Sequence, residues 1–176
     1  MADEMMTDEE QVERLRQWWA EYGRLVIAGI VLGVGLLFGG QAWRDYRERQ
    51  LVEASNLYQE VEQAAAAGDT ERLEALAGQL ADGYARSPYD TQARLVLARL
   101  HVEGGDLEAA LESLDAALAS AESEEVAAVA RTRKARVLLS LDRPEEVLEL
   151  LGTQPQSQFA GLHYELVGDA LASLGR

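Results

Sequence analysis

The stretch LVIAGIVLGVGLLFGGQAW, residues 25–43, decides how this chain is organised, because it carries no charged side chain and lies between Arg24 and Arg44. As a helix it would be roughly 28 Å long, close to the thickness of the hydrocarbon core of a bilayer. A cleaved signal peptide has a shorter apolar region, normally about 7–15 residues, and a small-residue cleavage motif. The segment 41–44 offers no such motif. We therefore expect an uncleaved transmembrane helix rather than a signal peptide or a buried helix of a soluble domain.

The residues before the span, 1–24, carry the pattern of an amphipathic helix. Thr7 and Glu10 have the T-x-x-E spacing of a helix-opening capping box, and apolar side chains then recur at helical spacing. Aromatic side chains on both sides of the span match the belts found where membranes meet water. The expected interfacial anchors are Trp18, Trp19, Tyr22, Trp43 and Tyr46.

Two glycine pairs inside the span have the G-x-x-x-G spacing: Gly29 with Gly33, and Gly35 with Gly39. Such pairs let a neighbouring transmembrane helix approach closely. Glycine is also common in spans that pack against no partner, and the motif often occurs by chance. Both helix packing and simple lipid contact therefore stay open.

Basic side chains do not decide the orientation of the span. Three arginines precede it and three follow it closely: Arg14, Arg16 and Arg24, then Arg44, Arg47 and Arg49. The positive-inside rule counts these short flanks, whereas a long domain can be translocated largely regardless of its charge. The tie leaves the topology open, with a slight preference for a cytoplasmic N-terminus.

The chain after the span is rich in Ala, Leu and Glu and is expected to be almost wholly helical. Turns near 68–69, 105–106 and 142–143 interrupt it at intervals of 37 residues. A fixed period of this size is typical of helical repeat arrays, in which helix pairs stack to bury their apolar faces. The expected pairs are 51–67 with 70–85, 91–103 with 107–120, and 124–141 with 144–151. The fold class is therefore all-α: one N-terminal transmembrane helix followed by a tetratricopeptide-like helical-repeat solenoid.

The final segment, 162–174, has the pattern of another first helix of a pair, since Ser173 to Arg176 is similar to Ser140 to Arg143. No second helix follows it in the sequence. Repeat arrays normally end in a capping helix with a polar outer face. We expect this helix either to act as the cap or to be covered by a partner or a second copy.

The composition excludes several kinds of chemistry. From residue 51 on, the chain has 22 acidic and 10 basic side chains, a net charge of about −12 that repels nucleic acid. There is no cysteine, so thiolate metal sites, disulfides and cysteine nucleophiles are absent. His101 and His163 lack the spacing of metal ligands, and no nucleophile motif or phosphate-binding glycine loop occurs. We expect no catalytic, cofactor or metal site, and not an enzyme.

One short stretch reverses the charge of this acidic region. Arg131, Arg133, Lys134 and Arg136 lie close together in the sequence. Guanidinium groups bind carboxylates well, so these residues could hold an acidic tail or a terminal carboxylate of a partner. The alternative is an ordinary solvated helix, because a helix spreads such residues over several directions and the acidic pair 124–125 lies nearby.

Three parts of the chain carry a resemblance to a known family: the block from Gln11 to Arg24, the span opening Ile30 to Gly35, and the repeats. The chain resembles the ancillary SecYEG translocon subunits of Gram-negative bacteria. The resemblance implies a cytoplasmic segment 1–24, a transmembrane helix 25–43 and a periplasmic repeat domain 44–176 in the inner membrane. It also implies association with the SecYEG channel, with a membrane-anchored periplasmic chaperone of peptidyl-prolyl isomerase type, and with emerging secretory chains. The family pattern continues through another helix after the last turn, which this sequence does not have.

The leading hypothesis is a non-enzymatic adaptor. Its span would recruit it to the translocon, and the concave face of the solenoid would bind a chaperone or a nascent chain, because repeat arrays expose extended surfaces. The alternative is a membrane-tethered repeat scaffold for assembly of cell-envelope complexes.

Overall fold

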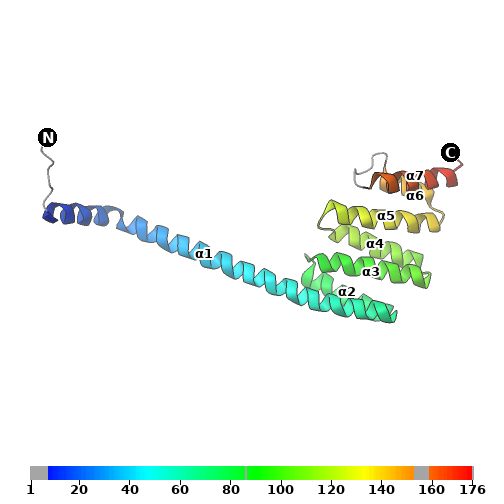
Figure 1. The fold of residues 1–176 in the computed structure, drawn as a ribbon, viewed down its shortest axis with the longest axis horizontal. Coiled ribbons are helices and arrows are strands. Elements are labelled where there is room, and N and C mark those ends of the chain that lie inside the picture. The colour runs from blue at the N-terminus through cyan, green and yellow to red at the C-terminus, as the bar shows by residue number, and fades with distance from the viewer. Residues whose placement is uncertain (1–7, 86, 153–158, 176) are drawn as a thin grey trace. The chain divides into compact units, whose positions relative to one another are not determined.

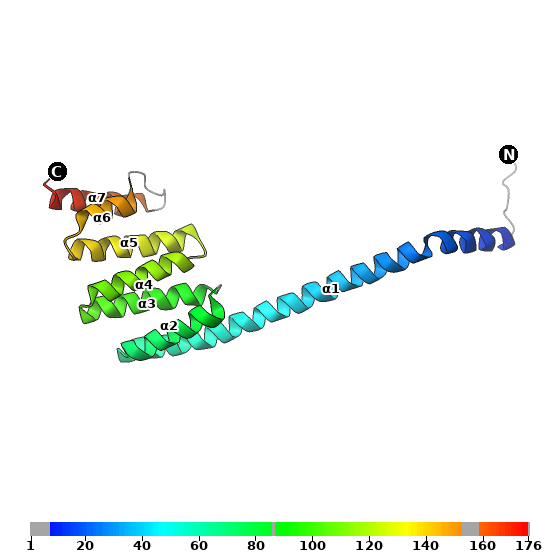
Figure 2. The same ribbon diagram turned by 180° about the vertical axis from the view of Figure 1, so that it is seen from behind.

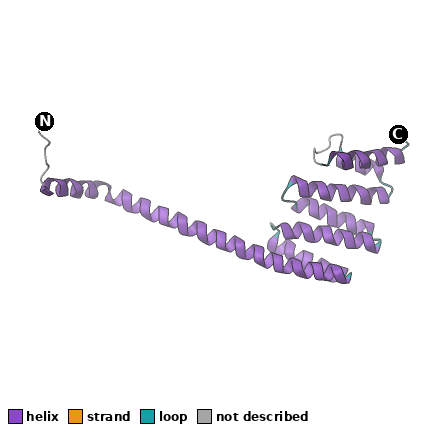
Figure 3. Cartoon of the chain, in the orientation of Figure 1, coloured by secondary structure: helices purple, strands orange, loops and turns teal. Residues whose placement is uncertain are grey.

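The computed structural model describes residues 8–85, 87–152 and 159–175. Over these residues the secondary structure is entirely helical, with no strand (Figure 3). The helices are α1 Asp8–Ala67, α2 Thr70–Tyr84, α3 Pro88–Gly104, α4 Leu107–Ser120, α5 Glu124–Ser140, α6 Pro144–Leu151 and α7 Ala160–Ser173. The all-α fold class expected from the sequence is confirmed. Thr7, the expected first residue of the capping box, lies outside the described residues.

The chain divides into two compact units, Met1–Arg49 and Gln50–Arg176, and α1 contributes residues to both. In the described part of the first unit nearly every side chain from residue 12 on is exposed, and Phe38 is 73% exposed. Among the described residues, α1 is the one helix long and apolar enough to cross a membrane. Exposure of so much apolar surface is unfavourable in water and favourable in hydrocarbon. This helix therefore fits a membrane anchor.

Aromatic contacts flank the apolar residues of α1. The ring centroid of Trp18 lies 6.3 Å from that of Trp19 and 6.0 Å from that of Tyr22. On the other side, the rings of Trp43 and Tyr46 are 6.2 Å apart. The five expected interfacial anchors thus lie in two groups, one at each end of the apolar stretch.

The second unit is a stack of helices in chain order, from the last turns of α1 through α2 to α7 (Figure 1). The view from behind shows the same order, with each helix beside the next (Figure 2). Helix α3 packs on α2 and α4, and α5 packs on α4, α6 and α7. Each neighbouring pair of helices buries apolar side chains that neither helix could bury alone, as in a repeat solenoid.

Equivalent backbone turns separate the helices of each pair. Gly68, Gly105 and Asp142, spaced 37 residues apart, have positive φ angles of +68°, +82° and +58°. This left-handed conformation ends an α-helix and reverses the chain within a few residues. Asp69 and Asp106 then start the next helix, since their side chains accept hydrogen bonds from the backbone N–H groups of Arg72 and Ala109. Asp142 shows that the third turn keeps the geometry without glycine.

The same period places side chains in the core. Leu73, Ala110 and Val147, one in each second helix, are fully buried. In the first helices of the pairs, Val61, Ala98 and Ala135 occupy equivalent buried positions. Two clusters result, one over α1 to α3 and one over α3 to α7. Burial of each Leu or Val side chain contributes about 1.5–3 kcal/mol to folding.

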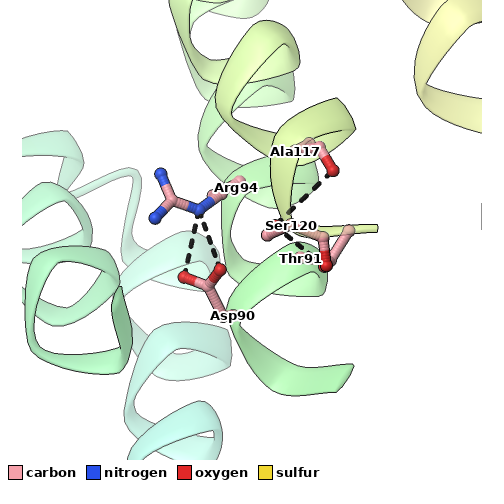
Figure 4. A network of polar contacts seen from close by, with 5 residues as sticks. All are labelled: Asp90, Thr91, Arg94, Ala117 and Ser120. Carbon is pink, nitrogen blue, oxygen red and sulfur yellow. Dashed lines mark hydrogen bonds and ion pairs between the residues drawn. The ribbon is translucent and has the colours of Figure 1, made fainter. Parts of the chain in front are cut away.

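Polar side chains are buried at the start of α3 (Figure 4). The Asp90 carboxylate accepts two hydrogen bonds from Nε of Arg94, at 3.0 and 3.1 Å. Thr91 donates from Oγ1 to the backbone carbonyl of Ser120 at 2.8 Å, which ties α3 to the last turn of α4. A buried charge requires such a partner, because solvation by water has been lost.

We predict that Gly105→Ala destabilises the repeat domain by about 1–2 kcal/mol, because a side chain strains the left-handed conformation. The neighbouring Gly104 has no positive φ, and a Cβ atom there would meet nothing within 4 Å. Gly104→Ala is therefore the matched control and should lower the stability by no measurable amount. Urea unfolding of the full chain in detergent, followed by circular dichroism, measures both. Equal effects of the two substitutions would contradict the assigned turn.

We also predict that Asp90→Asn destabilises the domain by about 3 kcal/mol, because the charge of Arg94 loses its counter-charge at a site where Asp90 is fully buried. Arg72→Gln, which breaks an exposed pair with Glu60, should change the stability by less than about 1 kcal/mol. The same unfolding experiment compares them. A small effect of Asp90→Asn would show that the buried pair contributes little.

Candidate functional site

Two adjoining hollows lie along the first helices of the repeat pairs, with volumes of about 380 and 350 Å³. Leu95, Arg99 and Arg133 line both hollows, which are together called the groove below. The groove lies wholly within the second unit. Extended surfaces of this kind are what repeat arrays offer to partners.

Helical periodicity brings the groove residues together. Residues three or four apart share one face of a helix. Helix α1 contributes Tyr58, Glu62 and Ala65, helix α3 contributes Leu95, Arg99 and Val102, and helix α5 contributes Arg133, Arg136 and Val137. Glu62, Arg99 and Arg136 are equivalent positions of successive repeats, since each is 37 residues from the next.

The two hollows differ in character. The one between α3 and α5 is almost wholly apolar, and its apolar lining consists of Leu95, Ala98, Val102, Leu114 and Val137. The hollow nearer α1 contains the phenol of Tyr58 and the carboxylate of Glu62. Burial raises the pKa of Tyr58, and nearby Glu62 adds to this while Arg99 opposes it. The phenol therefore stays protonated at neutral pH and can donate a hydrogen bond.

The structure separates the four basic residues that are adjacent in the sequence. Arg131 forms an ion pair with Glu124, and Lys134 forms one with Asp115 of α4, and both basic side chains are largely buried. Arg133 and Arg136 instead are exposed and line the groove. Nη1 of Arg133 donates to the backbone carbonyl of Leu95 at a long 3.5 Å.

Arg136 has the least engaged side chain of the four. In the part of the chain that the structure describes, no hydrogen bond or ion pair holds its guanidinium group. Arg99, which the sequence pattern did not single out, lines the same hollow from α3. The signal was present in the sequence, because the 37-residue offset aligns Arg99 with Arg136.

The histidines and the third hollow form no further candidate site among the described residues. No group of three or more His, Asp or Glu side chains that could hold a metal ion occurs among the described residues. Nε2 of His101 lies 3.5 Å from Glu74, and the ring of His163 packs edge-on against that of Tyr164. A third hollow, beside the turn between α4 and α5, is lined by Glu124 and Arg131, which already pair with each other.

The glycine pairs of the apolar stretch leave room for a neighbouring helix. A Cβ atom built at Gly29, Gly33, Gly35 or Gly39 would meet nothing within 4 Å. The surface of α1 at these positions is therefore open within this chain. Contact with another transmembrane helix stays a prediction.

Comparison with known proteins gives one consistent result. The family model of a tetratricopeptide repeat-like domain matches residues 16–176. A protein of Escherichia coli (strain K12) is 31% identical over 168 residues, which cover 96% of this chain and 81% of that protein. A protein of Haemophilus influenzae is 26% identical, covering 96% and 82%. Both bear the name ancillary SecYEG translocon subunit. No solved structure matches the chain.

Proposed function

We propose that this chain, which belongs to the family of ancillary SecYEG translocon subunits, is a membrane-anchored, non-enzymatic adaptor of the translocon. The observation that carries the proposal is the similarity to the Escherichia coli protein, because it extends over 96% of the chain and so includes both the anchor and the repeats. The anchor would hold the protein beside the channel, and the repeat domain would bind a partner.

The proposed topology is a single span in the bacterial inner membrane, with residues 1–24 in the cytoplasm and 44–176 in the periplasm. The family resemblance supports this orientation, whereas the equal numbers of flanking arginines do not. The lack of cysteine is compatible with an oxidising compartment.

Two surfaces would make the contacts. The glycine faces of the span are open and suit close approach of a channel helix. The groove combines apolar walls with exposed arginines and suits a polypeptide. Its proposed occupant belongs to a membrane-anchored periplasmic chaperone of peptidyl-prolyl isomerase type or to an emerging secretory chain.

Association with the channel can be tested directly. After crosslinking in native membranes, purification of the full chain should enrich the SecYEG channel. Substitution of both Gly29 and Gly33 by Leu should reduce this enrichment severalfold, because the larger side chains keep a neighbouring helix away. A second variant carries Leu at Gly35 and Gly39, and Val31→Leu is the control without loss of a glycine. Absence of channel subunits from the purified wild-type complex would contradict the proposal, and recovery of envelope-assembly proteins in their place would favour a scaffold.

The proposed topology can be tested by protease protection. Protease added to spheroplasts should digest the repeat domain, since it would face the periplasm and be accessible from outside the inner membrane. Immunoblotting against the C-terminal part of the chain measures this, with a cytoplasmic protein as the control for intact spheroplasts. A repeat domain that survives until detergent is added lies in the cytoplasm and would refute the orientation.

A further inference from the structure

We infer that the groove binds a partner segment in which acidic side chains alternate with apolar ones, and that Arg99, Arg133 and Arg136 bind its carboxylates. The inference deepens the proposed adaptor function and rests on it, because it names the chemistry of the segment that the repeat domain would recognise.

The groove is lined by arginines although the chain as a whole is acidic. The whole chain has a formal net charge of −15, yet three exposed guanidinium groups line one small hollow between α3 and α5. Two carboxylates lie beside Arg99, those of Glu103 and Glu62. Nε of Arg99 lies 3.8 Å from Glu103 in a largely exposed pair, which is too long for a hydrogen bond. Glu62 lines only the hollow nearer α1.

These arginines keep most of their N–H donors unused within the described residues. Each guanidinium has five N–H donors arranged in a plane that matches a carboxylate. Arg133 uses one of them in a long contact, and Arg136 uses none among the described residues. By contrast, Arg131 and Lys134 on the same helix form ion pairs with carboxylates of this chain. The donors that remain open are therefore those of the arginines that line the groove.

The apolar lining selects a peptide rather than a small anion. Leu95, Val102 and Val137 provide walls on which an apolar side chain is buried next to the arginines. Val102 is 42% exposed in this structure, so burial by a ligand would remove apolar surface from water. A nucleic acid or an inorganic anion would gain nothing from these walls, and the surrounding acidic surface would repel a polyanion.

The shape of the groove favours an internal segment over a chain end. The hollow between α3 and α5 adjoins the hollow lined by Tyr58 and Glu62, with which it shares Arg99 and Arg133, so a bound peptide can extend along both. Arginines on two helices also provide for more than one carboxylate. We therefore assign the site to acidic side chains within a partner segment, not to a terminal carboxylate.

Fluorescence anisotropy with designed peptides tests the inference on the full chain in detergent. The probe is a short peptide of alternating Leu and Glu, acetylated and amidated so that only its side chains carry charge. We expect it to bind about tenfold more tightly than the same peptide with Gln in place of Glu. Added salt should weaken binding of the Glu peptide alone. A third peptide has Gln side chains and a free C-terminal carboxylate and should bind no better than its amidated form.

Variants identify the arginines. Arg136→Gln and Arg133→Gln should each weaken binding of the Glu peptide about fivefold or more. Arg131→Gln is the matched control, because it removes the same charge from the same helix, and it should change the affinity less than twofold. Circular dichroism verifies that each variant is folded.

Three results would overturn the inference: equal binding of the Glu and Gln peptides, equal effects of Arg131→Gln and Arg136→Gln, or binding that requires the free carboxyl terminus. Failure of the adaptor proposal is distinguishable, because it appears as loss of channel subunits from the wild-type complex. Peptide binding that depends on Arg133 and Arg136 would still establish the site.

Discussion

A left-handed residue at the end of each first helix is the constraint on which the repeat domain depends. Without it the helix would continue, and the following helix could not return along its neighbour. Gly68, Gly105 and Asp142 adopt this conformation at intervals of 37 residues, and Gly175 adopts it after α7. Since the turns are equivalent, the residues counted from them are equivalent as well. Leu73, Ala110 and Val147 are fully buried for this reason.

The two units expose different kinds of surface to their surroundings. In the repeat domain apolar side chains face neighbouring helices, and charged residues cover the outside. In the described residues of the first unit, apolar side chains such as Phe38 are exposed all around the helix. Such a surface is stable only where the surroundings are themselves apolar, because the helix satisfies its own backbone hydrogen bonds but buries no side chains. A single chain thus joins a helix suited to lipid to a stack of helices suited to water.

The repeats also explain how the groove forms, because equivalent positions of successive helix pairs line it. The positions of Glu62, Arg99 and Arg136 are structurally equivalent and face the same side of the stack. Changing the side chain at one repeat changes the charge at one point along the groove and leaves the framework as it is. The acidic end at α1 and the basic end at α5 differ in this way. The hydrogen bond from Thr91 to the backbone carbonyl of Ser120, by contrast, ties α3 to α4 and so belongs to the framework.

The sequence by itself determined the all-α class, the apolar stretch 25–43 and the positions of the turns. These are local properties: hydropathy over one helix, helical periodicity, and glycine or aspartate where the backbone must be left-handed. It did not determine the site. The basic residues 131–136 formed one cluster in the sequence, but Lys134 pairs with Asp115, 19 residues earlier, while Arg133 contacts the backbone of Leu95, 38 residues earlier. Only the tertiary structure, in which α5 packs against α4 and Arg133 reaches α3, decided which cations were paired and which were left at the groove, because the partner of a charged side chain depends on which helices meet in space.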